Sequence, residues 1–124
     1  MAHILLIDDD EQFRLMLKQM LSGDGHRVSE ASDGTDGLQA AAASRPDLVI
    51  TDILMPKKDG IEVIVDINRN DPSLPIIAIS GGRRTISAEF NLDSARMMGV
   101  RATLAKPFSR DQLRAAIRKV LPST

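Results

Sequence analysis

Four short runs of the sequence are almost continuously apolar or small, which is typical of strands buried on both faces, as in a parallel sheet. They are residues 4–7 (ILLI), 48–50 (LVI), 76–79 (IIAI) and 102–105 (ATLA). A fifth run, residues 27–31 (RVSEA), alternates polar and apolar positions more regularly, as an edge strand does. The pattern predicts five strands.

The segments between these runs have apolar residues at helical spacing. The clearest examples are Phe13, Leu17, Met20 and Leu21 near the start and Leu113, Ala116, Ile117, Val120 and Leu121 near the end. Residues that interrupt helices follow each predicted helix in turn. They are Gly23 and Gly25, Pro46, Pro72 and Pro75, Gly99, and Pro122.

Regular alternation of strands and helices predicts right-handed crossovers and helices on both faces of the sheet. The fold class is therefore α/β, a flavodoxin-like doubly wound sheet of five parallel strands, order 2-1-3-4-5, with five helices. A chain of 124 residues suits one hydrophobic core, so residues 1–124 are interpreted as a single domain without an output domain.

The amino-acid composition indicates the kind of core and excludes several kinds of protein. Aromatic residues make up 2% of the chain and Trp and Tyr are absent, so the core must be aliphatic, and we expect Met16, Met97 and Met98 to help fill it. The absence of Cys excludes disulfides and thiol chemistry. Neither a signal peptide nor a membrane-spanning apolar stretch is recognisable, which favours a cytoplasmic protein.

Each of the four apolar runs ends at a polar group. Asp8 and Asp9 follow the first run, and Asp52, Ser80 and Lys106 follow the third, fourth and fifth. Because parallel strands end at one edge of the sheet, we expect all five side chains to converge there, with the first and third strands adjacent. This shared placement is more specific than any one of the residues.

Three neighbouring carboxylates need a counter-charge, since two unit charges about 4 Å apart repel by about 4 kcal/mol at an effective dielectric near 20. A hard divalent cation such as Mg²⁺ accepts carboxylate, carbonyl, water and phosphate oxygens as ligands. Asp52, standing alone, is the best candidate for a nucleophile that attacks phosphorus, with Asp8 and Asp9 holding the metal. Lys106 and Ser80 would neutralise the phosphoryl oxygens.

Taken singly, these residues also have ordinary structural explanations. An acidic pair before a helix often serves capping, which is the role expected of Asp10 and Glu11. A lone Ser or Lys at a strand end is a weak signal. His3 and His26 are far apart in sequence and have no third partner, so a histidine metal site is not expected.

Several motifs in this order carry a resemblance to a known family. They are Ile4-Leu5-Leu6-Ile7-Asp8-Asp9, the segment 46–56 (PDLVITDILMP) followed by Asp59-Gly60, the segment 75–80 (PIIAIS), and Lys106-Pro107-Phe108. Over its whole length the chain resembles the receiver domain of two-component response regulators. Each motif is weak alone, but the set and its spacing are specific.

The resemblance implies a role for each acidic residue. Asp52 accepts a phosphoryl group from a phosphohistidine on a sensor histidine kinase or a histidine phosphotransfer protein. Asp9 and Asp52 bind Mg²⁺, with Mn²⁺ as an alternative, together with the backbone carbonyl of Leu54. Asp8 holds water molecules of the metal. No further cofactor is implied.

The resemblance also implies a switch. Lys106 contacts the phosphoryl group, and the bond before Pro107 is cis, an isomer of low cost only before proline. Ser80 moves toward the phosphoryl oxygens, and Thr103 occupies the position where the family often has an aromatic residue. We therefore hypothesise that residues 81–99, which contain Gly81 and Gly82, carry the conformational change.

Two further positions bear on the lifetime of the acyl phosphate. In the family, the residues two after the acceptor and two after the switch hydroxyl tune hydrolysis, and here they are Leu54 and Gly82. Neither side chain can orient a water molecule. We predict a long-lived acyl phosphate.

Charge is unevenly distributed. Residues 1–82 hold seven basic and fourteen acidic residues, a net charge of −7, and residues 83–124 hold nine and three, a net charge of +6. We expect a protein-binding face on the fourth helix, the fifth strand and the fifth helix. Its basic residues would suit a downstream protein target, although a solvated surface explains the charge equally well. We expect no direct nucleic-acid binding and no membrane insertion, with a monomer or a phosphorylation-dependent dimer.

Other functions explain less of the sequence. A haloacid-dehalogenase-like phosphohydrolase also uses an Asp nucleophile and Mg²⁺, but needs a second Asp where this chain has Leu54. A flavodoxin-like FMN carrier would need aromatic residues to stack on the flavin, and this chain has neither Trp nor Tyr. A phosphorylation-independent scaffold would not need all five site residues. The sequence favours a signalling phospho-acceptor, not an enzyme acting on other substrates.

Overall fold

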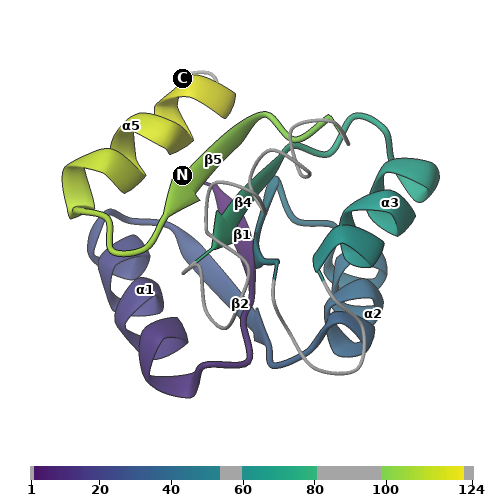
Figure 1. Ribbon diagram of the computed structural model, residues 1–124, viewed down its shortest axis with the longest axis horizontal. Coiled ribbons are helices and arrows are strands. Elements are labelled where there is room, and N and C mark those ends of the chain that lie inside the picture. Colours follow the sequence, from purple (N-terminus) through teal and green to yellow (C-terminus); the bar gives the residue numbers. More distant parts are fainter. Residues whose placement is uncertain (1, 54–59, 81–98, 122–124) are drawn as a thin grey trace.

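Five parallel strands form one sheet in the computed structural model, which describes residues 2–53, 60–80 and 99–121 (Figure 1). The strand order is β2-β1-β3-β4-β5, which confirms the predicted topology. The strands are β1 (His3–Ile7), β2 (Arg27–Ala31), β3 (Leu48–Asp52), β4 (Ile76–Ser80) and β5 (Ala102–Ala105).

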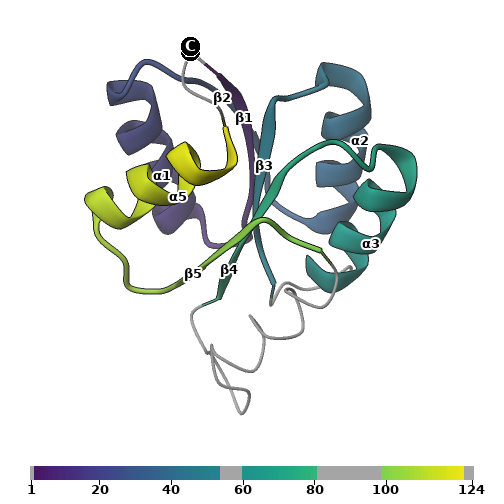
Figure 2. The ribbon, with the colours of Figure 1, turned by 90° about the horizontal axis from the view of Figure 1, so that it is seen from above.

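The helices cover both faces of the sheet, as the alternating pattern predicts. Figure 2 shows α1 and α5 on one side and α2 and α3 on the other. Their bounds are Glu11–Gly23 for α1, Gly34–Ser44 for α2, Gly60–Asn70 for α3 and Arg110–Val120 for α5. The described part of the chain thus contains four of the five predicted helices. The remaining one was expected within residues 81–98, outside that part.

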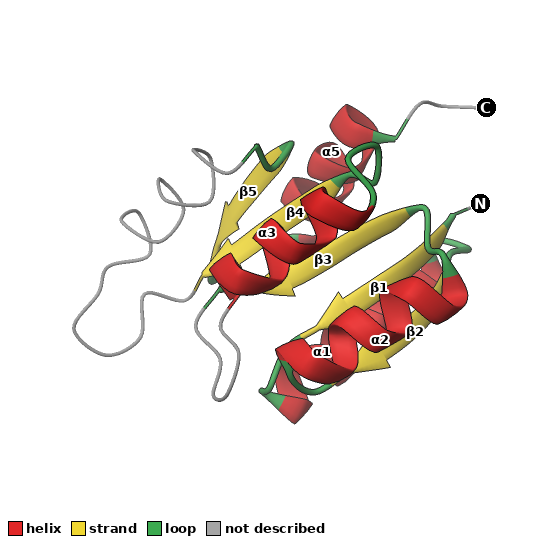
Figure 3. Ribbon diagram, turned by 90° about the vertical axis from the view of Figure 1, so that its right-hand side faces the viewer, coloured by secondary structure: helices red, strands yellow, loops and turns green. Residues whose placement is uncertain are grey.

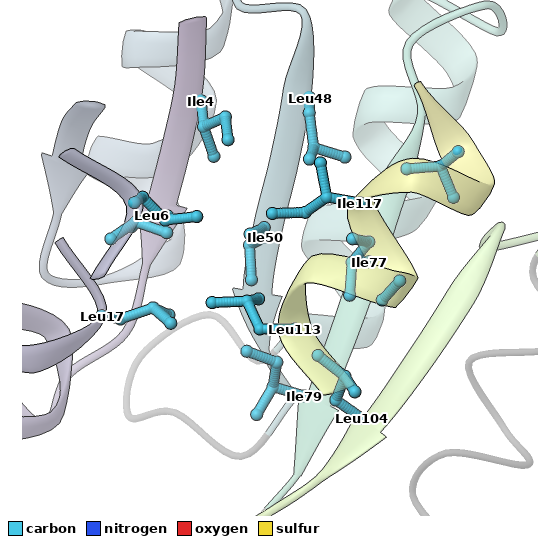
Figure 4. Packing of buried hydrophobic residues seen from close by; sticks show 13 residues of the cluster. Ile4, Leu6, Leu17, Leu48, Ile50, Ile77, Ile79, Leu104, Leu113 and Ile117 are labelled. Carbon is cyan, nitrogen blue, oxygen red and sulfur yellow. The ribbon is translucent and has the colours of Figure 1, made fainter. Parts of the chain in front are cut away.

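The core consists of two aliphatic clusters, one on each face of the sheet. Alternate residues of β1 enter different clusters: Ile4 and Leu6 pack with α1 and α5, and Leu5 and Ile7 pack with α2 and α3. Figure 4 shows the first cluster, in which Leu113 of α5 packs over the sheet. Burying one such side chain fully contributes about 1.5–3 kcal/mol, so these clusters fix the strand register.

Two expectations about burial were wrong. The run 102–105 was interpreted as covered on both faces, but in β5 Leu104 alone is buried and Ala105 is exposed, because β5 is an edge strand. Met16 was expected in the core but is 41% exposed, since it lies on the outer side of α1. Met97 and Met98 lie outside the described residues.

The helix starts follow local sequence signals. Asp10 is the N-cap of α1, and its carboxylate accepts a hydrogen bond from the Phe13 amide, as expected. Ser109 caps α5 in a reciprocal arrangement with Gln112. These caps matter for function because α1 is the helix that follows β1 and α5 the helix that follows β5, the strands whose ends carry Asp8 and Lys106. Figure 3 shows the strands running in the same direction across the sheet. Within the described residues, no helix is long and apolar enough to cross a membrane.

Candidate phosphoryl-acceptor site

The topology brings the polar strand ends together at one edge of the sheet. β1 and β3 are adjacent and paired in parallel register, with Ile7 opposite Thr51. Asp8 and Asp9 therefore emerge beside Asp52, and the three residues can each offer an oxygen within 4.8 Å of the others. In the sequence, Asp52 follows Asp9 by 43 positions.

Asp8 and Asp52 are buried, each 3% exposed. One carboxylate oxygen of Asp8, Oδ1, accepts a hydrogen bond of 2.9 Å from the Asp10 amide. The backbone carbonyl of Asp8 accepts another, of 2.6 Å, from the Arg14 guanidinium. The turn that follows β1 is thus held by groups of α1, and this fixes the direction in which the Asp8 carboxylate points.

Lys106 supplies positive charge between two carboxylates. Its Nζ lies 3.3 Å from Oδ2 of Asp8 and 3.2 Å from Oδ2 of Asp52, and the side chain is only 12% exposed. The Lys106 amide donates to the Ser80 carbonyl at 2.8 Å, which ties the end of β5 to the end of β4. The Lys106–Pro107 peptide bond is cis, the isomer that the resemblance implied.

Asp9 supplies an oxygen that the protein itself leaves unused. Its Oδ1 is buried and has no hydrogen-bond partner among the described residues. Such an atom normally carries a desolvation penalty of about 1–3 kcal/mol, more when charged. Three carboxylates against one ammonium leave negative charge in excess, and oxygen donors of this kind suit Mg²⁺. The residues therefore fit a divalent cation.

The hydroxyl groups assigned to the switch lie on the neighbouring strands. Ser80 is fully buried at the end of β4. Thr103 is half-buried on β5, opposite Ala78 in the parallel register. Leu54 and Gly82 fall outside the described residues.

The end of β3 depends on a glycine that the sequence reading treated only as part of a motif. The Gly60 amide donates to the Ile53 carbonyl at 2.7 Å. A Cβ at Gly60 would collide with the carbonyl oxygen of Asp52 and lie 2.5 Å from the Cα of Ile53. α3 can begin this close to Asp52 only because residue 60 has no side chain.

Two aromatic residues near Lys106 were also missed as site residues. The Lys106 Nζ lies 4.0 Å from the ring centroid of Phe13. The ring of Phe13 meets that of Phe108 in an edge-to-face contact, at 5.7 Å and 86°. In the sequence, Phe13 has the spacing of a core residue, and no local signal distinguishes it from one.

A pair of basic residues on α1 reaches the neighbouring edge strand. Arg14 Nε and Lys18 Nζ contact the carboxylate of Glu30 at 3.1 and 3.0 Å. Burial raises the pKa of Glu30, but the hydrogen bonds and charges of Lys18 and Arg14 together outweigh burial. The pKa of Glu30 therefore lies below its ordinary value. Arg14 therefore links Glu30 of β2 to the backbone carbonyl of Asp8.

The histidines do not join the acidic cluster. His3 Nε2 lies 2.7 Å from Ser29 Oγ, and His26 Nδ1 accepts a hydrogen bond from the Ala2 amide. His3 is the first residue of β1, and Ala2 and His26 directly precede β1 and β2, so both histidines lie at the ends of these strands away from Asp8 and Asp9.

Comparisons with known proteins agree with this fold. The sequence profile of the response regulator receiver domain matches residues 4–118. Transcriptional regulatory protein AfsQ1 of Streptomyces coelicolor is 39% identical over 121 residues, 98% of this chain and 52% of that protein. Response regulator MprA of Mycobacterium leprae is 35% identical over 98% of this chain and 51% of that protein. The chain spans about half the length of these curated relatives.

Solved structures give the same result. A response regulator receiver domain protein from Clostridium thermocellum matches with a TM-score of 0.86 and 31% identity, over 97% of this chain and 94% of that one. Chemotaxis protein CheY4 of Vibrio cholerae matches with a TM-score of 0.86 and 28% identity, over 98% and 99% of the two chains.

The fold and the edge of the sheet define a class: a doubly wound α/β protein with a cluster of three carboxylates and one lysine at its strand ends. Within that class, the chain belongs to the response regulator receiver domain family. Members of this family are phospho-acceptors of two-component signal transduction and not enzymes in the usual sense.

Proposed function

We propose that Asp52 accepts a phosphoryl group from a sensor histidine kinase or a histidine phosphotransfer protein, in a reaction that depends on Mg²⁺ or Mn²⁺. The observation that carries the proposal is the position of the Asp52 carboxylate. It is buried at the end of a central strand, within 4.8 Å of two other carboxylates and 3.2 Å from an ammonium group.

The chemistry requires a nucleophile and neutralisation of charge on the phosphoryl oxygens. A carboxylate oxygen of Asp52 attacks phosphorus, and the new O–P bond forms as the P–N bond of the phosphohistidine breaks. The imidazole leaves with the electron pair of that bond and takes up a proton. The product is an acyl phosphate on Asp52.

The acidic residues would hold the cation and Lys106 would steady the transferred group. Asp9 and Asp52, with the backbone carbonyl of Leu54, are the proposed ligands, and Asp8 would orient water molecules. A bound divalent cation supplies charge neutralisation for the phosphoryl oxygens. The Lys106 ammonium contacts both Asp8 and Asp52, so it is close enough to form an ion pair with a phosphoryl oxygen on Asp52.

The response to phosphorylation would pass through hydroxyl groups on β4 and β5. Ser80 would donate a hydrogen bond to the phosphoryl group. Thr103, on the edge strand β5, would be the second residue of the switch. The proposed output surface comprises the segment between β4 and β5, strand β5 and helix α5. It would bind a downstream protein target, or a second copy of the chain after phosphorylation.

The cellular setting is proposed on the same basis. We propose that the protein works in the cytoplasm, where its kinase partner presents phosphohistidine, and that this module acts through protein contacts, with no direct nucleic-acid binding and no membrane insertion. Relatives such as AfsQ1 are named as transcriptional regulators and are about twice as long as this chain.

The first experiment is intact-mass measurement after incubation with acetyl phosphate, with Mg²⁺ or with a chelator. We expect the gain of one phosphoryl group, dependent on Mg²⁺ and abolished in Asp52→Asn. Asp111→Asn is the matched control, because Asp111 is 93% exposed on α5. No gain in the wild-type chain would favour a phosphorylation-independent scaffold, and turnover of many acetyl phosphate molecules would favour a phosphohydrolase.

A further inference from the structure

The Lys106 ammonium contacts an aromatic ring as well as two carboxylates. Its Nζ lies 4.0 Å from the centroid of Phe13, on the first turn of α1, while the carboxylate oxygens of Asp8 and Asp52 are at 3.3 and 3.2 Å. The lysine side chain is mostly buried, so water competes little for these contacts. A cation within about 6 Å of a ring centroid is attracted by the ring, more strongly when desolvated.

The ring differs from the carboxylates in how it responds to metal. A divalent cation bound by Asp9 and Asp52, with Asp8 holding its water molecules, would take up much of the negative charge that attracts Lys106. It also repels the ammonium directly. The ring of Phe13 carries no net charge and is not a ligand, so its attraction for Lys106 persists when the metal binds.

A second ring holds the first in place. Phe108 follows Lys106 by two residues and meets Phe13 edge to face at 5.7 Å and 86°. Edge-to-face pairs of this geometry are favourable beyond their buried area. Phe13 is thereby packed against the segment that carries Lys106, and α1 and α5 lie on the same side of the sheet (Figure 2).

We propose that Phe13 is a positioning residue that keeps the Lys106 ammonium at the acidic edge of the sheet when the divalent cation is bound. The inference rests on the proposed function, in which Lys106 stabilises the transferred phosphoryl group. Phe13 itself touches neither substrate nor metal and acts through Lys106.

The rate test compares Phe13→Leu with Phe13→Tyr. Leucine keeps an apolar side chain but has no ring, whereas tyrosine restores the ring. We expect the rate of phosphorylation by acetyl phosphate at saturating Mg²⁺ to fall about 3- to 30-fold in Phe13→Leu, the range a cation–π contact can supply. Phe13→Tyr should stay near the wild-type rate, and the Mg²⁺ dissociation constant should change little in either variant.

A spectroscopic readout tests the contact independently of phosphorylation. Protons on the ε-carbon of a lysine above a ring face are shifted upfield, and selective labelling of lysine makes this resonance of Lys106 visible by NMR. The shift should be present in the wild type with and without Mg²⁺, absent in Phe13→Leu and retained in Phe13→Tyr. Leu15→Ala is the matched control, because Leu15 is 52% exposed on the same helix and its removal should leave the shift unchanged.

The outcomes separate the two proposals. No upfield shift in the wild type with Mg²⁺ bound, or an unchanged rate in a folded Phe13→Leu variant, would overturn the role of Phe13 alone. If Phe13→Leu does not fold, Phe13→Met provides a second ring-free side chain for the same comparison. Failure of the wild-type chain to accept a phosphoryl group would contradict the proposed function, and the NMR result would still decide whether Phe13 holds Lys106.

Discussion

Asp9 is the residue at which the proposed metal site and the stability of the metal-free protein conflict. It adds negative charge beside Asp8 and Asp52, and its buried Oδ1 has no hydrogen-bond partner within the described ranges. Lys106 contacts Asp8 and Asp52, so the charge of Asp9 is the least compensated of the three.

We therefore expect Asp9→Asn to stabilise the metal-free protein. The free energy of unfolding should rise by about 1–2 kcal/mol, a fraction of the ~4 kcal/mol repulsion between unit charges at 4 Å and a dielectric near 20. Urea denaturation in a chelator measures this. Mg²⁺ should then stabilise the wild type but not the variant. Asp10→Asn is the control, because Asn caps a helix as well as Asp; an equal rise there would contradict the explanation.

Gly60 controls the site through backbone packing. A Cβ at this position would meet backbone atoms of Asp52 and Ile53, which cannot move without shifting the end of β3. We expect Gly60→Ala to cost about 2–4 kcal/mol of unfolding free energy, since overpacking against rigid groups is among the larger mutational effects.

The matched control for Gly60→Ala is Gly23→Ala at the end of α1. There a Cβ would meet only the guanidinium of Arg110 at 3.0 Å, the far end of a flexible side chain. Alanine also favours helix by about 0.5–1 kcal/mol relative to glycine. Thermal denaturation of both variants should show a large loss at residue 60 and little change at residue 23. Equal losses would mean that the backbone contact is unimportant.

An ion-pair cluster joins the end of α1 to the start of α5. Asp24, the C-cap of α1, receives hydrogen bonds from Arg114 at 2.7 and 2.9 Å and from Arg110 at 3.0 Å. The hydrogen bond from Arg114 is the main cause that holds the pKa of Asp24 well below its ordinary value of 3.8, although burial opposes it. The same contact raises the pKa of Arg114.

This cluster predicts a pH dependence with a definite sign. The pKa of Asp24 is lower in the folded chain than in the unfolded chain, so its contribution to stability is complete above about pH 5 and is lost as the pH falls toward the folded pKa. The urea midpoint of the wild type should therefore drop more steeply than that of Asp24→Asn between about pH 5 and pH 2.5. Asp111→Asn should follow the wild type. Parallel curves for wild type and Asp24→Asn would refute the prediction.

The elements differ in how far local sequence determined them. The runs 4–7, 48–50 and 76–79 were predicted as inner strands because both of their faces are apolar, and each is an inner strand. The run 102–105 is equally small and apolar, yet β5 is an edge strand. The residue pattern of so short a strand does not show whether it has one neighbouring strand or two.

At the scale of the domain, the proposed function predicts a signal that lasts as long as the acyl phosphate. Leu54 and Gly82 lie at the positions that tune hydrolysis in the family, and neither offers a hydrogen-bonding side chain to an attacking water. We expect slow loss of the phosphoryl group. The loss can be measured by intact-mass analysis after the phosphoryl donor is removed. Leu54→Asn should shorten the lifetime, whereas rapid loss from the wild type would contradict the prediction.

The sequence by itself determined the fold class, the strand order, and the convergence of Asp8, Asp9, Asp52 and Lys106. These follow from local rules: apolar runs form buried strands, and parallel strands end at a common edge. Polar groups placed after neighbouring parallel strands must then meet, whatever the details of packing.

Tertiary structure alone decided the contacts between segments that are distant in the chain. The ring of Phe13 over Lys106, the backbone of Asp52 against Gly60, and the pairing of Asp24 with Arg114 depend on distances of a few ångströms between packed elements. Residue patterns specify which face of an element is buried, but not which side chain lies opposite. That is settled only when helices and sheet pack together, because packing fixes the position of each side chain relative to its neighbours.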